Sequence, residues 1–171
     1  MEEIETDSWQ DEYCGYTAQR YAIRLSCFCS AVLPSDKKFQ ELLGEEIVKE
    51  LLGLAFYGRK TMELRDARQV TIQNDPLWPA SKVANPESNL FHAFGTIIHS
   101  KKIAVHWEQP DDCNEATGGS NPYKKSGREA RFAGSISAIS KKDETAKLPI
   151  GAIVASYIHF QNQQETIGSK T

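Results

Sequence analysis

Residues 88–103 read S-N-L-F-H-A-F-G-T-I-I-H-S-K-K-I, and the change of hydrophobic period inside this stretch decides the predicted fold. Apolar residues first recur at helical spacing, at Leu90, Phe94, Ile97 and Ile98. With an Asn cap at 85 and Pro86 at the first turn, this spacing predicts a helix from Pro86 to His99. The period then becomes two, at Ile103, Val105 and Trp107, which predicts a strand directly after the helix.

Two further helices are predicted on the N-terminal side. The first has one apolar stripe, formed by Ala18, Tyr21, Ala22, Leu25, Phe28, Cys29 and Val32, and Pro34 ends it. The second runs from Lys37 to Val70, with a stripe formed by Phe39, Leu43, Ile47, Leu51, Leu54 and Met62. Further apolar residues widen that stripe: Leu42, Val48, Leu52, Ala55 and Phe56. We therefore expect the second helix to be central to the core.

The C-terminal part predicts a second strand and one ambiguous segment. The polar segment at 109–128 predicts a mobile loop. Residues 131–139 then predict a second strand, antiparallel to the first. Residues 148–162 fit a helix or a strand, and we favour a helix. The predicted fold is therefore α+β: a bundle of three or four helices with a short antiparallel β-ribbon after the third helix. We expect a flexible arm at 1–16, one domain at 17–162 and a tail at 163–171.

Composition indicates one ordinary globular domain. The chain has 171 residues, 40% hydrophobic and 25% charged, with a net charge of −3. This charge does not favour nucleic acid or an anionic membrane as a partner, except through a local basic patch. No apolar run is long enough to predict a membrane span, and the acidic N-terminus does not resemble a secretory signal. We expect a cytoplasmic protein that does not contact a membrane.

The four cysteines do not predict a metal site. They are Cys14, Cys27, Cys29 and Cys113. Cys27 and Cys29 point in nearly opposite directions on a helix, and no second pair follows them with the spacing of a zinc site. We therefore expect free thiols, no metal and no cofactor.

Two histidines are candidates for chemistry. His92 and His99 lie on one helix face but about 10 Å apart along its axis, so they cannot share one metal ion. Either imidazole alone could act as a general acid or base, because its pKa is ordinarily near neutrality. The alternative is that His92 is merely exposed and that His99 is favoured by the helix dipole at its C-terminal end.

The order of elements resembles the HEPN group, helical bundle domains associated with nucleotides and RNA. Ile97, Ile98, His99 and Ser100 match a segment that ends a helix in some bacterial members, where a β-hairpin follows. The arrangement covers 17–108, and the specific match covers about a dozen residues. The resemblance implies a homodimer and, as ligand, RNA or a partner protein.

Active members of that group are metal-independent endoribonucleases with an R-x4-6-H motif. The resemblance implies that His99 is the general base, yet the positions for the arginine hold His92, Ala93 and Phe94. Either His92 or an arginine of the second helix substitutes, or the domain does no catalysis, and we favour the latter. We therefore predict a non-catalytic interaction or regulatory module, with an endoribonuclease using His99 as the alternative. Its expected binding residues are basic: Arg59, Lys60, Arg65, Arg68, Lys101 and Lys102.

Overall fold

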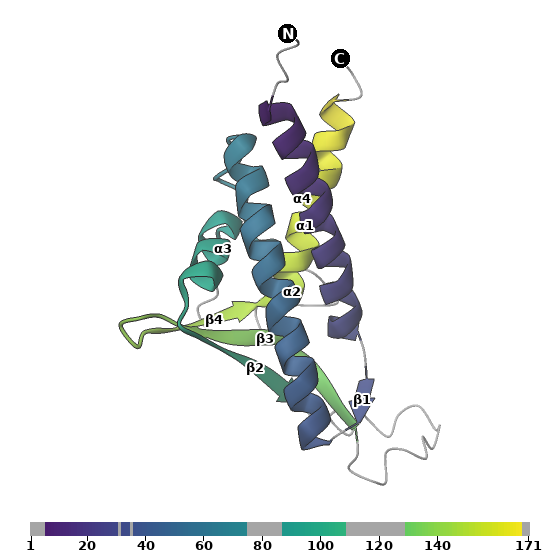
Figure 1. The fold of residues 1–171 in the computed structure, drawn as a ribbon, viewed down its shortest axis with the longest axis vertical. Helices are drawn as coiled ribbons and strands as arrows, with labels where there is room; N and C mark the ends of the chain where they lie inside the picture. Colours follow the sequence, from purple (N-terminus) through teal and green to yellow (C-terminus); the bar gives the residue numbers. More distant parts are fainter. Residues whose placement is uncertain (1–5, 31, 35, 75–86, 109–128, 169–171) are drawn as a thin grey trace.

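The protein folds as a helical bundle with an antiparallel sheet across one end, so the predicted α+β class is confirmed. The computed structural model describes residues 6–30, 32–34, 36–74, 87–108 and 129–168. Helices α1 (Thr6–Ser30), α2 (Lys37–Leu64) and α4 (Ile150–Gly168) lie alongside one another, with the shorter α3 (Leu90–His99) beside α2 (Figure 1). The start of α1 and the end of α4 lie at the end of the molecule opposite the sheet.

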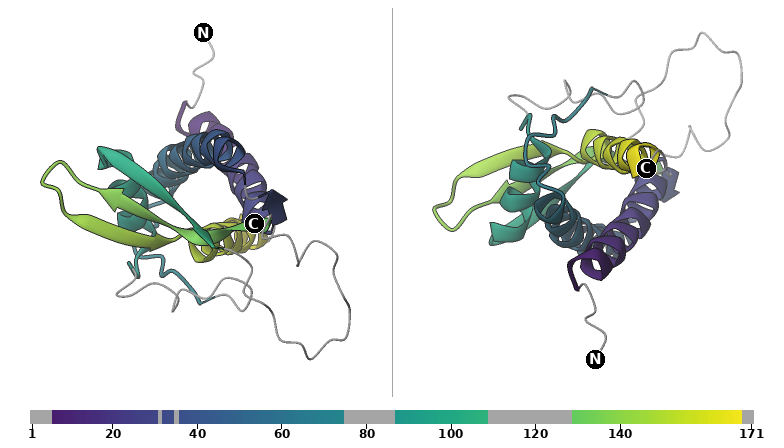
Figure 2. Two further views of the ribbon diagram at one scale, coloured as in Figure 1. Left: turned by 90° about the horizontal axis from the view of Figure 1, so that it is seen from below. Right: turned by 90° about the horizontal axis from the view of Figure 1, so that it is seen from above.

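The sheet is built around its long strand β3 (Glu129–Ile139). Strand β2 (Lys102–Glu108) pairs with β3 in antiparallel register, from Lys102 opposite Ile139 to Glu108 opposite Arg131. Strands β1 (Val32–Pro34) and β4 (Thr145–Pro149) also pair with β3 in antiparallel orientation. Figure 2 shows the β2–β3–β4 part projecting to one side of the three long helices. The predicted ribbon is therefore confirmed, and it is part of a four-stranded sheet.

The core lies between the helices and the inner face of the sheet. Its largest fully buried side chains include Tyr157 of α4, Phe94 of α3 and Leu51 of α2. Phe94 and Tyr157 meet edge to face, with ring centroids 5.9 Å apart. Gly58 of α2 makes this contact possible, because a Cβ there would lie 2.8 Å from the Phe94 ring. The absence of one side chain thus lets α2, α3 and α4 meet closely.

The predicted N-terminal arm was wrong for residues 6–16, which form the first part of α1. Trp9 stacks on Tyr13 with centroids 5.3 Å apart, and Tyr13 meets Tyr57 of α2 edge to face at 6.1 Å. These contacts join the start of α1 to α2. The predicted tail was also wrong for residues 163–168, because α4 continues to Gly168. Residues 1–5 and 169–171 lie outside the described part of the chain.

Helix α2 ends earlier than predicted, at Leu64 instead of Val70. Asp66 has a φ of 49°, in the left-handed region that ends helices, and the N–H of Ala67 donates to the carbonyl of Met62 at 2.8 Å. Aspartate adopts this conformation more readily than most residues. Consequently Arg65 and Arg68 follow the helix and do not continue one helical face with Arg59.

Helix α3 begins at Leu90 and is capped by Asn89, whose side chain accepts a hydrogen bond from the N–H of His92 at 3.0 Å. The predicted cap at Asn85 and the Pro86 turn lie outside the described residues, as does the predicted loop at 109–128. The ambiguous segment divides at Pro149: Leu148 and Pro149 end β4, and residues from Ile150 onward form α4. Its helical assignment is thus confirmed from Ile150 onward.

Candidate functional site

The expected basic face is divided between two sides of the bundle, because its arginines contact different elements. Arg65 faces α1 and α4: its Nε lies 2.7 Å from Oδ1 of Asp11, and its Nη1 donates to Oε1 of Gln161 at 3.0 Å. Arg59 faces α3, and its Nε donates to Glu63 at 3.2 Å. Each of these guanidinium groups is paired with a carboxylate within the chain, which reduces the charge it offers to a phosphate.

Arg59 also packs across helix α3. Its guanidinium carbon lies 4.3 Å from the centre of the Phe91 ring, and Arg68 approaches the same ring at 5.8 Å. The Arg59 Nη1 occupies the space that a side chain at Gly95 would need. A side chain at position 95 would therefore displace the end of the Arg59 side chain from its present place on α3. Of the two candidate arginines near α3, the helix that bears both histidines, Arg59 lies closer to the Phe91 ring than Arg68 does.

The two histidines are both exposed on α3. His99 is the last residue of the helix, one turn after Gly95, so it lies on the helix face against which Arg59 packs. The four-residue step from Gly95 to His99 corresponds to about 6 Å along the axis. His92 lies on the other side of Gly95, two turns before His99. The structure thus brings His99 and Arg59 to one face of α3, and it places Arg65 elsewhere.

The lysines are distributed around the molecule. Lys101 forms an ion pair with Asp143 of the β3–β4 turn, and Lys102 begins β2 as an exposed residue. Lys60 lies on α2, close enough to α1 for its charge to oppose the rise in the pKa of Cys14 that burial causes. The predicted basic residues therefore do not form one continuous patch in the described structure.

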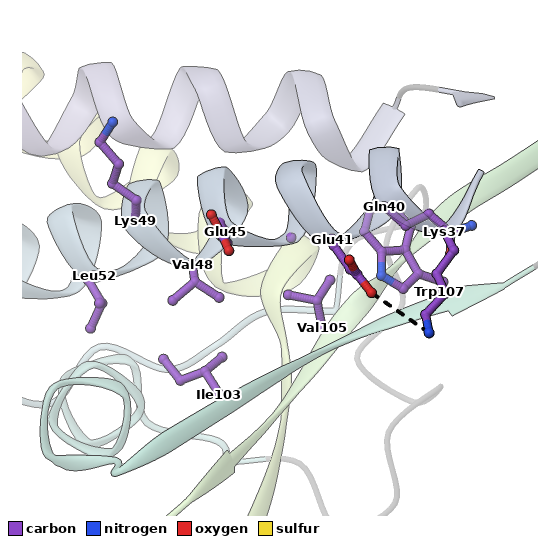
Figure 3. Close-up of a pocket in the computed structure, with 11 residues that line it drawn as sticks. Lys37, Gln40, Glu41, Glu45, Val48, Lys49, Leu52, Ile103, Val105 and Trp107 are labelled. Carbon is purple, nitrogen blue, oxygen red and sulfur yellow. Dashed lines mark ion pairs between the residues drawn. The ribbon is translucent and has the colours of Figure 1, made fainter. Parts of the chain in front are cut away.

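A groove with a volume of about 800 Å³ lies between α2 and β2. Val48 and Leu52 of α2 point toward β2, where Ile103 and Val105 form the opposite wall (Figure 3). Trp107 lies at the end of the groove beside the first turn of α2. Charged side chains border it, among them an ion pair between Lys37 and Glu41 at 3.9 Å. The groove is open, apolar along its walls and charged at its rim.

The sequence does not predict this groove, because the wide apolar stripe of α2 indicates core positions throughout. Ile47, Leu51, Leu54, Ala55 and Met62 are indeed buried. The expectation was wrong for the residues on the other side of α2: Phe39, Leu42, Leu52 and Phe56 are exposed. The width of the apolar stripe could have indicated these exposed residues. A helix that packs on one side of a core needs an apolar stripe of only ~100°, and the stripe of α2 is wider.

The described residues contain no cluster of three or more His, Cys, Asp or Glu side chains that could hold a metal ion. Cys14, Cys27 and Cys29 are free thiols, and Cys113 lies outside the described residues. Cys29 is buried, whereas Cys27 is exposed on the other side of α1. The two sulfur atoms thus face different environments, as their spacing on a helix predicts.

No helix in the described part of the chain is long and apolar enough to cross a membrane. Comparisons of the chain with models of protein families, with curated proteins and with solved structures found no match. The structure alone therefore supplies the evidence for a function.

Proposed function

We propose that this protein is a non-catalytic interaction module that binds a protein partner through the outer face of α2 and its adjoining groove. The observation that carries the proposal is the apolar groove wall formed by Val48, Leu52 and Val105, together with the exposed Leu42 and Phe56 on the same helix. Leu42 and Phe56 are 57% and 59% exposed. A gathering of exposed apolar side chains beside a groove is typical of surfaces that bind another protein.

Protein is a better candidate than RNA for this surface. An RNA site needs cations free to contact phosphates, and aromatic or polar groups that can read bases. Here the lysines near the groove are paired with carboxylates. Lys37 forms an ion pair with Glu41, and Lys49 forms one with Glu46 at 3.5 Å. The mixed charges at the rim suit the charged margin of a protein interface, where they select a partner and its orientation.

Peptide selection tests the proposal without assuming which protein is the partner. The full chain would be tethered at low density, so that copies cannot meet, and exposed to displayed random peptides. We expect selected peptides to be rich in apolar residues and to lose binding to Leu52→Glu and to Val105→Glu. The matched control is Ile23→Glu, which places the same charge on an exposed apolar position of α1. Peptides that still bind both groove variants would overturn the proposal.

A parallel experiment with RNA tests the alternative ligand. Single-stranded and structured RNA would be incubated with the protein in EDTA and also passed over it at two salt concentrations. We expect neither cleavage nor retention. Retention that weakens with salt would favour an RNA-binding module instead, because phosphate contacts release counterions.

A second candidate function is the metal-independent endoribonuclease, and the position of Arg59 favours it. Arg59 of α2 packs against α3 at Phe91 and Gly95, one turn before His99, so it is the candidate to replace the arginine missing from α3. In such a site His99 would move the proton of the 2′-hydroxyl and Arg59 would stabilise the phosphorane charge. Cleavage that disappears in both His99→Ala and Arg59→Gln, but persists in Lys141→Gln at an exposed position outside the candidate site, would establish this activity. It would also overturn the non-catalytic proposal.

A further inference from the structure

Six exposed residues of α2 form a seam with heptad spacing. They are Lys38, Leu42, Glu45, Lys49, Leu52 and Phe56, and the intervals between them alternate between four and three residues. All six are exposed. Residues with this alternation lie along one side of a helix, which is the geometry by which one helix packs against another. We refer to these six residues as the α2 seam.

The α2 seam is open to a partner. In the view of Figure 1, the lower part of α2 lies in front of the sheet. The close-up shows that Lys49 points away from β2, whereas Val48 and Leu52 point toward it (Figure 3). The α2 seam thus runs along the margin of the groove, with Lys49 on its outward side and Leu52 on its groove side. Its Leu42 and Phe56 are 57% and 59% exposed, and Leu52, which borders the groove, is 39% exposed.

We propose that the partner of this surface is a second copy of the chain, with the two α2 seams packed antiparallel about a two-fold axis level with Ile47. This inference rests on the proposed function, because it names the partner of the same surface. A two-fold axis at this level places Leu42 opposite Leu52 of the second copy. It also places Glu45 opposite Lys49 and Lys38 opposite Phe56 of the second copy, and each pairing occurs twice.

The charge order along α2 is the evidence for self-pairing. From its start, the α2 seam reads positive, apolar, negative, positive, apolar, apolar. In the antiparallel register, each Glu45 meets a Lys49 and each leucine meets a leucine. Lys38 packs its hydrocarbon stem and ammonium group against a Phe56 ring. All six residues of each copy therefore meet a favourable partner.

The alternative parallel arrangement is disfavoured by the same charges. Two parallel seams in register would place Glu45 against Glu45 and Lys49 against Lys49, and like charges at an interface are strongly unfavourable. The antiparallel contact spans about 27 Å of helix. One helix pair of that length gives an interface at the small end of the range for specific complexes, so we expect a dimer that dissociates on dilution.

Charge exchange in the purified full chain tests both the partner and the register. Sedimentation equilibrium should show a concentration-dependent dimer for the wild type. Glu45→Lys alone and Lys49→Glu alone should each raise the dissociation constant by at least about tenfold, because each creates two like-charge contacts. An equimolar mixture of the two variants should recover the dimer. Glu12→Lys, which makes the same charge change at an exposed position of α1, should have no effect.

The double variant Glu45→Lys with Lys49→Glu in one chain distinguishes the two orientations. In the antiparallel dimer, each new lysine meets a new glutamate, so dimerisation should recover. In a parallel dimer, like charges would still meet and it would not recover. Since all the changed side chains are exposed, circular dichroism should show that each variant keeps the fold.

Cysteine cross-linking fixes the register more closely. In a Cys27→Ser background, which removes an exposed thiol, Leu42→Cys would be mixed with Leu52→Cys and oxidised mildly. We expect a disulfide between residues 42 and 52 of different copies, mapped by mass spectrometry. Neither variant alone should form the link, because two copies of position 42 would lie about 15 Å apart along the axis.

The outcomes separate this inference from the proposed function. A wild-type protein that stays monomeric at high concentration, while selected peptides bind the α2–β2 surface, would overturn self-pairing and leave the interaction module standing. A dimer that is unaffected by Glu45→Lys would also overturn self-pairing through α2. If the protein is monomeric and selected peptides ignore this surface, both proposals fail.

Discussion

Arg65, just beyond the end of α2, forms an ion pair with Asp11 of α1, which lies 54 residues earlier in the sequence. The Nε of Arg65 is 2.7 Å from one carboxylate oxygen of Asp11 and 3.0 Å from the other. The same guanidinium reaches Gln161 of α4, and the Nε2 of Gln161 donates to the hydroxyl of Tyr157 at 2.5 Å. One arginine thus connects three helices at the end of the bundle opposite the sheet. This network makes the first part of α1 a component of the folded domain.

Loss of the Asp11 carboxylate should therefore weaken the whole domain. We expect Asp11→Ala to lower the free energy of unfolding by about 1–2 kcal/mol, because Arg65 is half-buried and would lose its charged partner. Urea denaturation measures the change. Glu12→Ala, at the exposed neighbouring position, is the control and should change stability little. Equal stability of the two variants would show that the N-terminal turns of α1 do not support the fold.

Two glycines of α2 should respond oppositely to alanine. A Cβ at Gly53 would lie 2.5 Å from the Tyr21 ring, so Gly53→Ala should force α1 outward and lower stability by about 1–3 kcal/mol. At Gly44 the nearest side-chain atoms lie 4.0 Å away, in Trp107 and Val105. Gly44→Ala should therefore raise stability by about 0.5–1 kcal/mol through helix propensity alone. Thermal denaturation of the two single variants compares these effects. A Gly53→Ala protein more stable than the wild type would contradict the packing of α1 on α2.

Stability should fall at alkaline pH because of Cys29. Burial raises the pKa of this thiol from 9.0 to about 12. Since the folded state keeps the proton and the unfolded state releases it, Cys29 favours folding fully below pH 9. That contribution declines as the pH rises from 9 toward 12. At pH 10 the loss is on the order of 1 kcal/mol for this group.

Urea denaturation between pH 8 and 10, under reducing conditions, measures this decline. Cys29→Ala should reduce the slope of stability against pH, whereas Cys27→Ala, which removes an exposed thiol from the same helix, should keep it. Burial also raises the pKa of Tyr157 to about 12, so part of the slope should remain in Cys29→Ala. A slope that does not change in Cys29→Ala would contradict the burial of this thiol.

The cap of α3 should contribute measurably to stability. Asn89 accepts a hydrogen bond from the N–H of His92, and its side-chain amide donates to the carbonyl of Arg68 at 3.0 Å. Asn89→Ala removes both, and we expect a loss of about 1 kcal/mol. Ser88→Ala, at the exposed preceding position, is the matched control for urea denaturation. A loss in Ser88→Ala as large as that in Asn89→Ala would contradict the assignment of the cap.

The sequence by itself determined the order and type of most elements. Hydrophobic period distinguishes a helix from a strand without knowledge of the fold, and it located α3, β2 and β3 and most of α1 and α2. It was least informative where apolar residues were continuous, as around Pro149, because a buried strand and a buried helix then have the same pattern.

Only the tertiary structure decided which apolar and charged residues have partners. The helical period shows that Leu42 and Leu51 are both apolar, but it does not show that the bundle covers Leu51 and leaves Leu42 exposed. Likewise, the sequence shows Asp11 only as one of several acidic residues near the N-terminus. The fold places Arg65 beside it and so makes it part of an ion pair. The physical reason is the same for both: burial and ion pairing depend on neighbours distant in sequence, whereas helical and strand periods are local properties of the chain.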